Sequence, residues 1–484
     1  MYNISHSVLL QAICHYAGND MNKLAIITQK EKIDYDLLWT NILHMAAYLQ
    51  SLDLKQGDYI LLSALKEIEF VYLYFASHLL GLTNVIIDPT SNEARKKYIL
   101  GLTKPKVFFG LKEEKRGIRY EDIVLPDTTP SINYSVSADD VADVMFTTGT
   151  TGEPKGVLLS YANIDASARN INGFIGNTAG DVEALGLPVC HSFGLGRLRC
   201  NFLVGATVVL LGSFANLKVF FEAFEKYHVT GFGMVPAVWE YVKKLSRDRI
   251  GNYREQVRYI EIGSAAMSVA DKKQLCELFP STRICMHYGM TEASRSLFME
   301  FHENKSDLTT IGLPVSDLVD VKIIDEDGKE VPDGEAGEIC VAGNMVMKSY
   351  FLPEDSRKAF WGKYFRTGDY GYRGTGGKYY LISRKKELIN VGGKKVSPVE
   401  IEEAVMALGV KDCICTAIKD PRGMLGEVPK LYVLKEGTSL GLDEIAGKLI
   451  SVLEHYKLPV QYEWIDKIPV TVSGKKQRLK MESE

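Results

Sequence analysis

Strand-like and helix-like runs alternate through roughly the first 310 residues of the chain. A strand–helix–strand repeat is typical of parallel sheets covered by helices. We therefore predict an α/β fold with a large N-terminal domain built on helix-covered parallel sheets. The expected strands are residues 59–63, 84–87, 106–109, 206–211, 231–235, 259–263 and 282–287, and helix-like stretches between them include residues 217–227 and 270–278.

The texture of the sequence changes after about residue 312. Residues 321–324, 337–342 and 378–381 read as short strands, and the segments between them are rich in Gly, Asp and Pro. This pattern predicts a smaller β-rich subdomain at about 312–383.

A second boundary is expected at the basic run 383–386. Beyond it, Ser397 and Pro398 provide a cap and a first-turn proline for a helix at 399–408. The remaining residues suffice for one small α+β domain. We therefore predict an N-terminal domain at 1–383 and a mobile C-terminal domain at 384–484.

The composition excludes several classes of protein. The formal net charge is −4, whereas a nucleic-acid-binding domain needs a basic patch or stripe. No run reaches the roughly 18 apolar residues of a membrane helix, and residues 1–20 lack the basic start of a signal peptide. The eight cysteines form no C-x-x-C pair, which favours reduced thiols. We predict a cytoplasmic protein without a nucleic-acid partner or an integral membrane segment.

The most informative segment is the loop FTTGTTGEPKG at 146–156. Its glycines let backbone N–H groups turn towards an anion, and its hydroxyls and lysine add donors for phosphate oxygens. It is not a Walker A loop, because Pro154 occupies the place of the second glycine. An ordinary polar surface loop is the alternative. The predicted phosphate-binding residues are Thr147, Thr148, Gly149, Thr150, Thr151, Gly152 and Lys155.

This loop resembles the signature of the adenylate-forming superfamily, which includes acyl-CoA synthetases, luciferases and the adenylation domains of peptide synthetases. Four further motifs follow in the family's order: HYGMTE at 287–292, FRTGD at 365–369, SRKK at 383–386 and PVTVSGK at 469–475. The resemblance implies an AMP-forming acyl-CoA synthetase. Such an enzyme uses ATP and Mg²⁺ to form an acyl-adenylate with release of pyrophosphate, and then makes a thioester with CoA.

Four motif residues resemble the family's nucleotide-binding positions. Asp369 is expected in a turn after a strand, where its carboxylate would accept both ribose hydroxyls; a turn-capping Asp is the alternative. Arg384 resembles the arginine that holds ribose and phosphate. Tyr288 would stack on adenine beside Gly289, unless it only packs in the core.

Three residues resemble the family's catalytic and metal positions. Thr291 would contact the α-phosphate, and Glu292 would be the single carboxylate on a magnesium ion that keeps several waters. Lys475 would bridge the substrate carboxylate and the α-phosphate, which offsets the repulsion between two anions. From the residues alone, a solvated basic tail is the favoured interpretation of Lys475, because Lys476, Arg478 and Lys480 lie close to it in the sequence.

The family's C-terminal domain rotates between two states, and two residues match positions involved in that motion. Lys386 falls at the hinge position. Gly393 matches the glycine that approaches the thiol tunnel in the second state. Ser383 stands where most relatives have Gly, which puts the backbone conformation before the hinge in doubt.

The segment PVCHSFG at 188–194 resembles the family's aromatic–histidine motif, with Cys190 in place of the aromatic residue. His191 would line the carboxylate end of the acyl pocket, and a buried structural histidine is the alternative. No carboxylate occurs between residues 185 and 201. An α-amino acid would leave its ammonium without a counter-ion there, so this substrate class is disfavoured.

Three arginines lie near the expected pocket: Arg197, Arg199 and Arg295. An arginine in an acyl pocket would suit a second carboxylate or phosphate on the substrate. The alternative for each is a solvated side chain, or an ion pair with Glu183 or Glu300.

The partners follow from this scheme: a small-molecule carboxylic acid, and CoA as the thiol. Delivery of the acyl group to a stand-alone carrier protein remains an alternative, as does a non-catalytic relative that only binds nucleotide. The acid, the oligomeric state and the pathway stay open.

Overall fold

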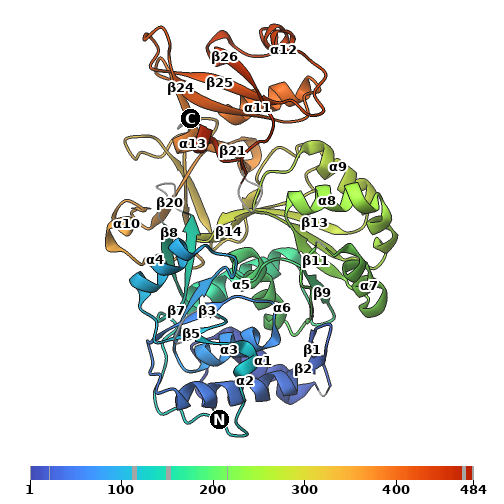
Figure 1. The fold of residues 1–484 in the computed structure, drawn as a ribbon, viewed down its shortest axis with the longest axis vertical. Coiled ribbons are helices and arrows are strands. Elements are labelled where there is room, and N and C mark those ends of the chain that lie inside the picture. The colour runs from blue at the N-terminus through green and yellow to red at the C-terminus, as the bar shows by residue number, and fades with distance from the viewer. Residues whose placement is uncertain are drawn as a thin grey trace. The chain divides into compact units, whose positions relative to one another are not determined.

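The computed structural model describes residues 2–20, 22–111, 117–148, 154–214, 216–470 and 476–481. The chain forms two compact units (Figure 1). The first comprises Met1–Asp320 with Val341–Phe365, and the second comprises Val321–Cys340 with Arg366–Glu484. Among the described helices, none has the length and apolar character needed to cross a membrane. The predicted boundary at 383/384 concerns domain motion and stays a prediction.

The first unit contains a nine-stranded sheet with the strand order β15-β14-β13-β12-β11-β9-β10-β1-β2. Its five central strands are parallel neighbours, as the alternation predicts. They are β9 (Val182–Leu185), β10 (Thr207–Leu210), β11 (Gly231–Met234), β12 (Tyr259–Ile262) and β13 (Arg283–Met290).

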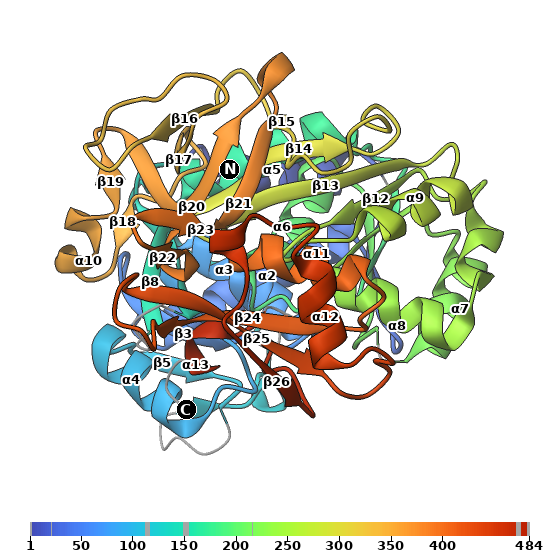
Figure 2. The same ribbon diagram turned by 90° about the horizontal axis from the view of Figure 1, so that it is seen from above.

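The helices between these strands cover both faces of the sheet. The chain moves from β9 to β10 in one direction through α6 (Ser192–Leu203), and returns past β9 to β11 through α7 (Leu217–Tyr227). Because such crossovers are right-handed, α6 and α7 lie on opposite faces. The helices α8 (Pro236–Ser246) and α9 (Val269–Leu278) continue in the direction of α7 and share its face (Figure 2).

A seven-stranded sheet in the same unit has the order β18-β8-β7-β4-β3-β5-β6. Between β3 and β4, the helix α3 (Ile68–Leu79) is buried at every position except Glu69. The chain then reverses direction through α4 (Glu93–Thr103), so α4 covers the opposite face. The strands are β3 (Tyr59–Ser63), β4 (Thr83–Ile87), β5 (Val107–Phe109), β6 (Gly117–Ile118), β7 (Val141–Thr148), β8 (Pro154–Ser160) and β18 (Ser349–Tyr350).

The reversals of strand order place the binding site. In open α/β sheets, ligands bind outside the carboxyl ends of the strands where the order reverses. The reversals lie between β3 and β5 in one sheet and between β9 and β11 in the other. The loops after these strands are therefore where a ligand site is expected.

In the second unit, the three-stranded sheet β24-β25-β26 is sandwiched between helices. Cys413 and Cys415 of β24 point into a core with α11 (Pro398–Ala407) and α12 (Leu442–Leu449). Ile414 points to the other face, where Met481 of α13 (Arg478–Met481) packs. The strands are β24 (Cys413–Lys419), β25 (Glu427–Leu434) and β26 (Gln461–Ile465).

The sequence predicts the type of these elements well. The strand at 59–63 and the helix at 217–227 are found at their predicted bounds, and Ser397 caps α11 with Pro398 in the first turn. The β-rich region contains β16 (Asp320–Ile324), β17 (Ala336–Ala342), β20 (Tyr364–Arg373) and β21 (Tyr379–Arg384). The other elements include α1 (Val8–Asn19), β1 (Leu24–Ile27), β2 (Lys32–Asp34), α2 (Tyr35–Ser51), α5 (Tyr161–Ile175), β14 (Ala293–Glu300), β15 (Leu313–Pro314), α10 (Pro353–Arg357), β19 (Phe360–Trp361), β22 (Ile389–Val391) and β23 (Lys394–Val396).

Candidate functional site

Both sheets of the first unit bring polar side chains to their carboxyl edges. Lys66, Asp88 and Thr147 lie at the ends of β3, β4 and β7 in the seven-stranded sheet. His191 and Glu292 follow β9 and β13 in the nine-stranded sheet. The Thr147 hydroxyl donates to Oε1 of Glu292 at 3.4 Å. The two edges therefore meet and form one candidate active site.

The predicted phosphate loop begins at the end of β7. Thr147 is described in full, whereas residues 149–152 and the side chain of Thr148 lie outside the described part of the chain. The guanidinium of Arg95, on α4, donates to the main-chain oxygen of Phe146 at 3.0 Å. This contact fixes the backbone from which the loop departs.

Lys155 follows the loop on β8. Its Nζ lies 2.5 Å from Oδ1 of Asp355 and 5.1 Å from the centre of the Tyr350 ring. The ammonium is therefore held at the site by a carboxylate and an aromatic face. Its predicted contact with phosphate stays a prediction.

Glu292 is almost buried, and its carboxylate accepts hydrogen bonds from two hydroxyl groups. The Tyr350 hydroxyl donates to Oε1 at 2.9 Å, and the Thr147 hydroxyl donates to the same oxygen at 3.4 Å. A carboxylate has about four acceptor positions. Oε2 accepts from neither hydroxyl, so the donor set fits a magnesium ion bound through one carboxylate and waters.

The remaining HYGMTE positions lie at the end of β13. The hydroxyls of Thr291 and Ser192 are 3.4 Å apart, which links β13 to the start of α6. Tyr288 pairs with Leu297 in the sheet and is partly exposed. Gly289 has no space for a side chain, since a Cβ there would lie 2.3 Å from the backbone nitrogen of Arg295.

His191 is the residue before the first turn of α6, and its side chain is 52% exposed. It is therefore not a buried structural histidine. Its Nε2 lies 3.9 Å from Oδ2 of Asp88. Burial, reinforced by the Asp88 carboxylate, raises the pKa of the neighbouring Cys190 thiol to about 12, so this thiol stays neutral near pH 7.

The position of Asp88 bears on whether an α-amino acid could be the substrate. No carboxylate occurs between residues 185 and 201, but the fold brings Asp88 beside His191 from a different sheet. A counter-ion for an ammonium is thus present at the motif. The sequence-based argument against α-amino acids loses its physical basis.

The three arginines of the expected pocket are all buried, so the solvated interpretation is wrong. Arg197 forms ion pairs with Glu183 and Glu261, which confirms the predicted partner Glu183. Arg199 pairs with Asp143, which also lies beside His78.

Arg295 completes the same buried network. Its Nε lies 2.7 Å from Oε1 of Glu261, and Nδ1 of His287 is also 2.7 Å from that oxygen. Burial alone would raise the pKa of Glu261, but the charges of Arg295 and Arg197 outweigh burial and hold that pKa well below its usual range. All three arginines therefore already have carboxylate partners, and none is free to bind a second acidic group of the substrate.

In the second unit, Asp369 and Arg384 form an ion pair, with Oδ1 and Nε 2.8 Å apart. Asp369 was expected in a turn, but it lies inside β20 opposite Arg384 of β21. Gly368 has a φ of +71°, which bends the strand without ending it. Asp369 is nearly buried and Arg384 is 39% exposed, so the pair presents its arginine to solvent.

The predicted hinge and tunnel residues are also in the second unit. Lys386 lies in a short 3₁₀ turn, Lys385–Glu387, that follows β21. Gly393 has a φ of +87°, and its N–H donates to Oδ1 of Asn390. Gly393 also lines a groove of about 360 Å³ in this unit. The assigned roles of Lys386 and Gly393 stay predictions.

Lys475 lies outside the described residues, but the residues after it are firmly held. Lys476 forms ion pairs with Glu402 and Asp412, and Arg478 pairs with Glu402 and Glu387. Neither side chain is a solvated tail. The chain is therefore anchored to α11 one residue after the predicted catalytic lysine.

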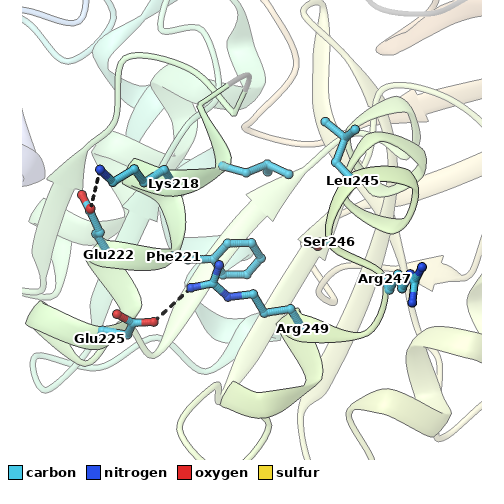
Figure 3. A pocket seen from close by; sticks show the side chains of 9 residues that line it. Lys218, Phe221, Glu222, Glu225, Leu245, Ser246, Arg247 and Arg249 are labelled. Atoms are coloured by element: carbon cyan, nitrogen blue, oxygen red, sulfur yellow. Dashed lines mark hydrogen bonds and ion pairs between the residues drawn. The ribbon is translucent and has the colours of Figure 1, made fainter.

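A surface groove of about 640 Å³ in the first unit lies apart from these residues, between α7 and the segment after α8 (Figure 3). Its charged groups pair with each other: Lys218 with Glu222, and Arg249 with Glu225. The Arg249 guanidinium also covers the Phe221 ring. We assign this groove no part in the chemistry.

Sequence reasoning missed five residues at the site. Position is a sequence signal for two of them, because Lys66 and Asp88 follow predicted strands at the carboxyl edge. Their partners are distant in sequence, so composition and spacing give no sign of them. They are Lys66, Asp88, Arg95, Tyr350 and Asp355.

Comparison with known proteins identifies the family. Residues 14–351 match the family model described as AMP-binding enzyme. The chain belongs to the AMP-binding enzyme family. This AMP-binding enzyme is 33% identical to the oxalate–CoA ligase of Saccharomyces cerevisiae, over 70% of this chain and 62% of that ligase. It is 30% identical to 4-coumarate–CoA ligase 1 of Narcissus pseudonarcissus, over 89% of this chain and 85% of that one.

The solved structures confirm the α/β fold over nearly the whole AMP-binding enzyme. O-succinylbenzoate coenzyme A synthetase of Bacillus subtilis, in complex with ATP and magnesium ion, matches with a TM-score of 0.86 at 25% identity. The match covers 97% of this chain and 98% of that one.

Proposed function

We propose that this AMP-binding enzyme is an acid–CoA ligase that works through an acyl-adenylate. The observation that carries the proposal is the meeting of two carboxyl edges, where Glu292, Thr291 and Thr147 lie together with His191. This arrangement sets a carboxylate for magnesium and several hydroxyls beside the start of a glycine-rich loop. The CoA ligases among its relatives support the same reaction class.

In the first half-reaction, an oxygen of the acid's carboxylate forms a bond to the α-phosphorus of ATP. The bond from that phosphorus to the bridging oxygen breaks, and pyrophosphate leaves. Glu292 would hold Mg²⁺, which neutralises phosphate charge when bound. Thr147 and the loop after it donate to phosphate oxygens, and Thr291 contacts the α-phosphate. His191 lies at the carboxylate end of the acid.

In the second half-reaction, the sulfur of CoA attacks the acyl carbon. The bond from the acyl carbon to the adenylate oxygen breaks, AMP leaves, and the thiol proton goes to solvent. Lys386 and Gly393 serve this step as hinge and tunnel residues. We propose CoA as the acceptor because the relatives are CoA ligases. A carrier-protein thiol is the alternative.

The acid itself is left open by the relatives. Oxalate and O-succinylbenzoate each carry two carboxyl groups, whereas 4-coumarate carries one. Both kinds of acid belong in the test, together with α-amino acids, since Asp88 provides a counter-ion beside His191.

The test is acid-dependent release of pyrophosphate from ATP, followed by mass analysis of the thioester. The panel contains short, long, aromatic and dicarboxylic acids and α-amino acids, each with CoA or with a phosphopantetheinylated carrier. We expect release with at least one acid, and a CoA thioester as the product. If no acid in the panel releases pyrophosphate, the protein is a nucleotide-binding relative without ligase activity.

Asp369→Ala is expected to raise the Michaelis constant for ATP about tenfold or more. Two ribose hydroxyls lose a charged acceptor, and each such hydrogen bond contributes about 1.5–3 kcal/mol. Initial rates at varied ATP give the constant. The matched control is Asp333→Ala, which removes a solvent-exposed partner of Arg373 in the same unit. An unchanged constant for Asp369→Ala would show that the carboxylate serves only Arg384.

A further inference from the structure

Lys66 lies where the carboxyl edges of the two sheets meet. It follows β3, and its ammonium donates to the main-chain oxygens of Gly186, after β9, and Gly212, after β10; the second bond is 3.1 Å long. An ammonium has three N–H donors. Two of them have acceptors among the described residues, and the third has none there.

Lys66 also lacks a counter-ion in the part of the chain that the structure describes, because both of its acceptors are neutral carbonyl oxygens. Lys66 is partly buried, and this burial lowers the pKa of its ammonium to about 8. Withdrawing a cation from water without an anionic partner is costly. An anion from outside the protein would offset this cost and would accept from the third N–H donor of Lys66.

The neighbouring groups do not supply this anion. The Cys190 thiol is neutral, because its pKa is raised to about 12. The Asp88 carboxylate accepts from the backbone N–H and hydroxyl of Thr90 at 2.7 and 2.6 Å, and its other oxygen faces His191 at 3.9 Å. Among the described residues, the Asp88 carboxylate contacts Thr90 and His191, and it has no contact with Lys66.

A purely structural role for Lys66 does not explain why a charged side chain occupies this partly buried position. The two carbonyl contacts tie the end of β3 to the ends of β9 and β10, and a neutral donor would do the same without the desolvation cost. The position of Lys66 also separates it from the phosphate groups of the site. It reaches the shared edge from β3, whereas Thr147 and Glu292 lie at the ends of β7 and β13.

We propose that Lys66 binds a second anionic group, a carboxylate or a sulfonate, on the acid that this enzyme activates. The inference rests on the proposed function and narrows its substrate to acids with two anionic groups. The buried arginines that would suit such a group are already paired, whereas Lys66 has an N–H donor without an acceptor among the described residues.

The test compares diacids with amide acids of the same shape: oxalate with oxamate, and succinate with succinamate. Each pair differs only in whether the distal group is charged. For the wild type we expect binding of the better diacid to exceed that of its amide acid by about 10- to 150-fold, the range of a charged hydrogen bond. In Lys66→Met this ratio falls to about one, while affinity for the amide acid changes less than about threefold.

Binding is measured by isothermal titration calorimetry without ATP, and turnover by pyrophosphate release with ATP. The matched control is Lys23→Met. The Lys23 ammonium also donates to a main-chain oxygen, that of Ala179, but Lys23 precedes β1 and so lies at the amino edge of its sheet. This variant is expected to keep the wild-type ratio.

The pH dependence gives an independent readout. The ammonium binds an anion only while it is protonated, so the diacid-to-amide-acid ratio of kcat/KM should fall as pH rises through about 8. Neither the Cys190 thiol nor the partly buried His191, whose pKa burial lowers, changes charge near pH 8. The other charged groups beside this part of the site are the Arg95 guanidinium and the Asp88 carboxylate. In Lys66→Arg the ratio should stay level up to pH 10.

The outcomes separate the two hypotheses. Equal affinity of the wild type for diacids and amide acids, or an unchanged preference in Lys66→Met, overturns the role of Lys66. An equal loss for both kinds of acid identifies Lys66 as a tether between strands. A diacid preference in calorimetry without pyrophosphate release refutes the ligase activity and leaves the Lys66 site standing.

Discussion

Lys475→Ala is expected to lower acid-dependent pyrophosphate release by about 100- to 1,000-fold, while thioester formation from supplied acyl-adenylate is spared. The first half-reaction brings together a carboxylate and a triphosphate, and a positioned cation offsets their repulsion in the transition state. Losing one such electrostatic donor costs about this factor in kcat. In the second half-reaction, the carboxylate and the α-phosphate are already joined in the adenylate. No repulsion between these two anions remains for Lys475 to offset.

The residues after Lys475 are anchored, so we expect the substitution to leave the structure of the following segment unchanged. Glu402 on α11 accepts from both Lys476 and Arg478, so the backbone leaving position 475 is fixed by groups that the substitution does not touch. We therefore expect the truncation to remove an ammonium without releasing the segment. Unchanged hydrogen exchange in α11 and β24 would verify this.

The two half-reactions are assayed separately, by pyrophosphate release and by CoA-dependent consumption of synthetic acyl-adenylate. Lys467→Ala, an exposed lysine in the same unit, is the control and should retain both activities. An equal loss of both half-reactions in Lys475→Ala would contradict a role confined to adenylation. It would point to a general defect of the second unit.

The fold was predictable because its signals are local. The periodicity of the hydrophobic residues and the length of the run predict a strand at residues 59–63 and an amphipathic helix at residues 217–227. The alternation then implies parallel sheets, and strand reversals imply the edge where ligands bind. Asp369 shows the limit of local signals. A Thr-Gly-Asp segment reads as a turn, yet pairing with β21 carries the strand through it.

The charges at the site were not predictable, because their partners are far away in sequence. Arg197 meets Glu261 across 64 residues, and His191 meets Asp88 from another sheet. Sequence alone could place arginines near the pocket, but not decide that carboxylates neutralise all of them. The contacts of Lys66 gave no signal at all, since its acceptors are main-chain oxygens that any residue provides.

A buried network of ion pairs surrounds Glu261. It stabilises the strands of the nine-stranded sheet that position this sheet's site residues. Its carboxylate contacts Arg197 at 3.1 Å and Arg295 and His287 at 2.7 Å, and all four side chains are almost completely buried. Gly263 packs against the same His287 ring, with space for no Cβ. The network therefore ties β12 to β13, β14 and α6, and it includes His287, the first residue of the HYGMTE segment.

Glu261→Ala is expected to lower the free energy of unfolding of the first unit by about 3–5 kcal/mol. Removing one member of a buried ion network leaves an uncompensated charge, here that of Arg295, while Arg197 keeps its second partner Glu183. Glu261→Gln, which keeps the shape, is expected to cost less than Glu261→Ala. Glu303→Ala is the matched control, because its pair with Arg283 of β13 is partly exposed and should contribute less than about 1 kcal/mol.

Native-state hydrogen exchange on amides of β11 and β12 measures this free energy for the first unit without interference from the second. The pKa of Glu261 is depressed in the folded state, so its stabilisation is fully present above the ordinary carboxyl pKa of about 4.3. It is lost only as pH falls towards the depressed value. The difference between wild type and Glu261→Ala should therefore stay constant from pH 6 to 8. A loss below 1 kcal/mol would mean that water or a rearranged partner replaces the carboxylate, and that the arginines do not depend on Glu261.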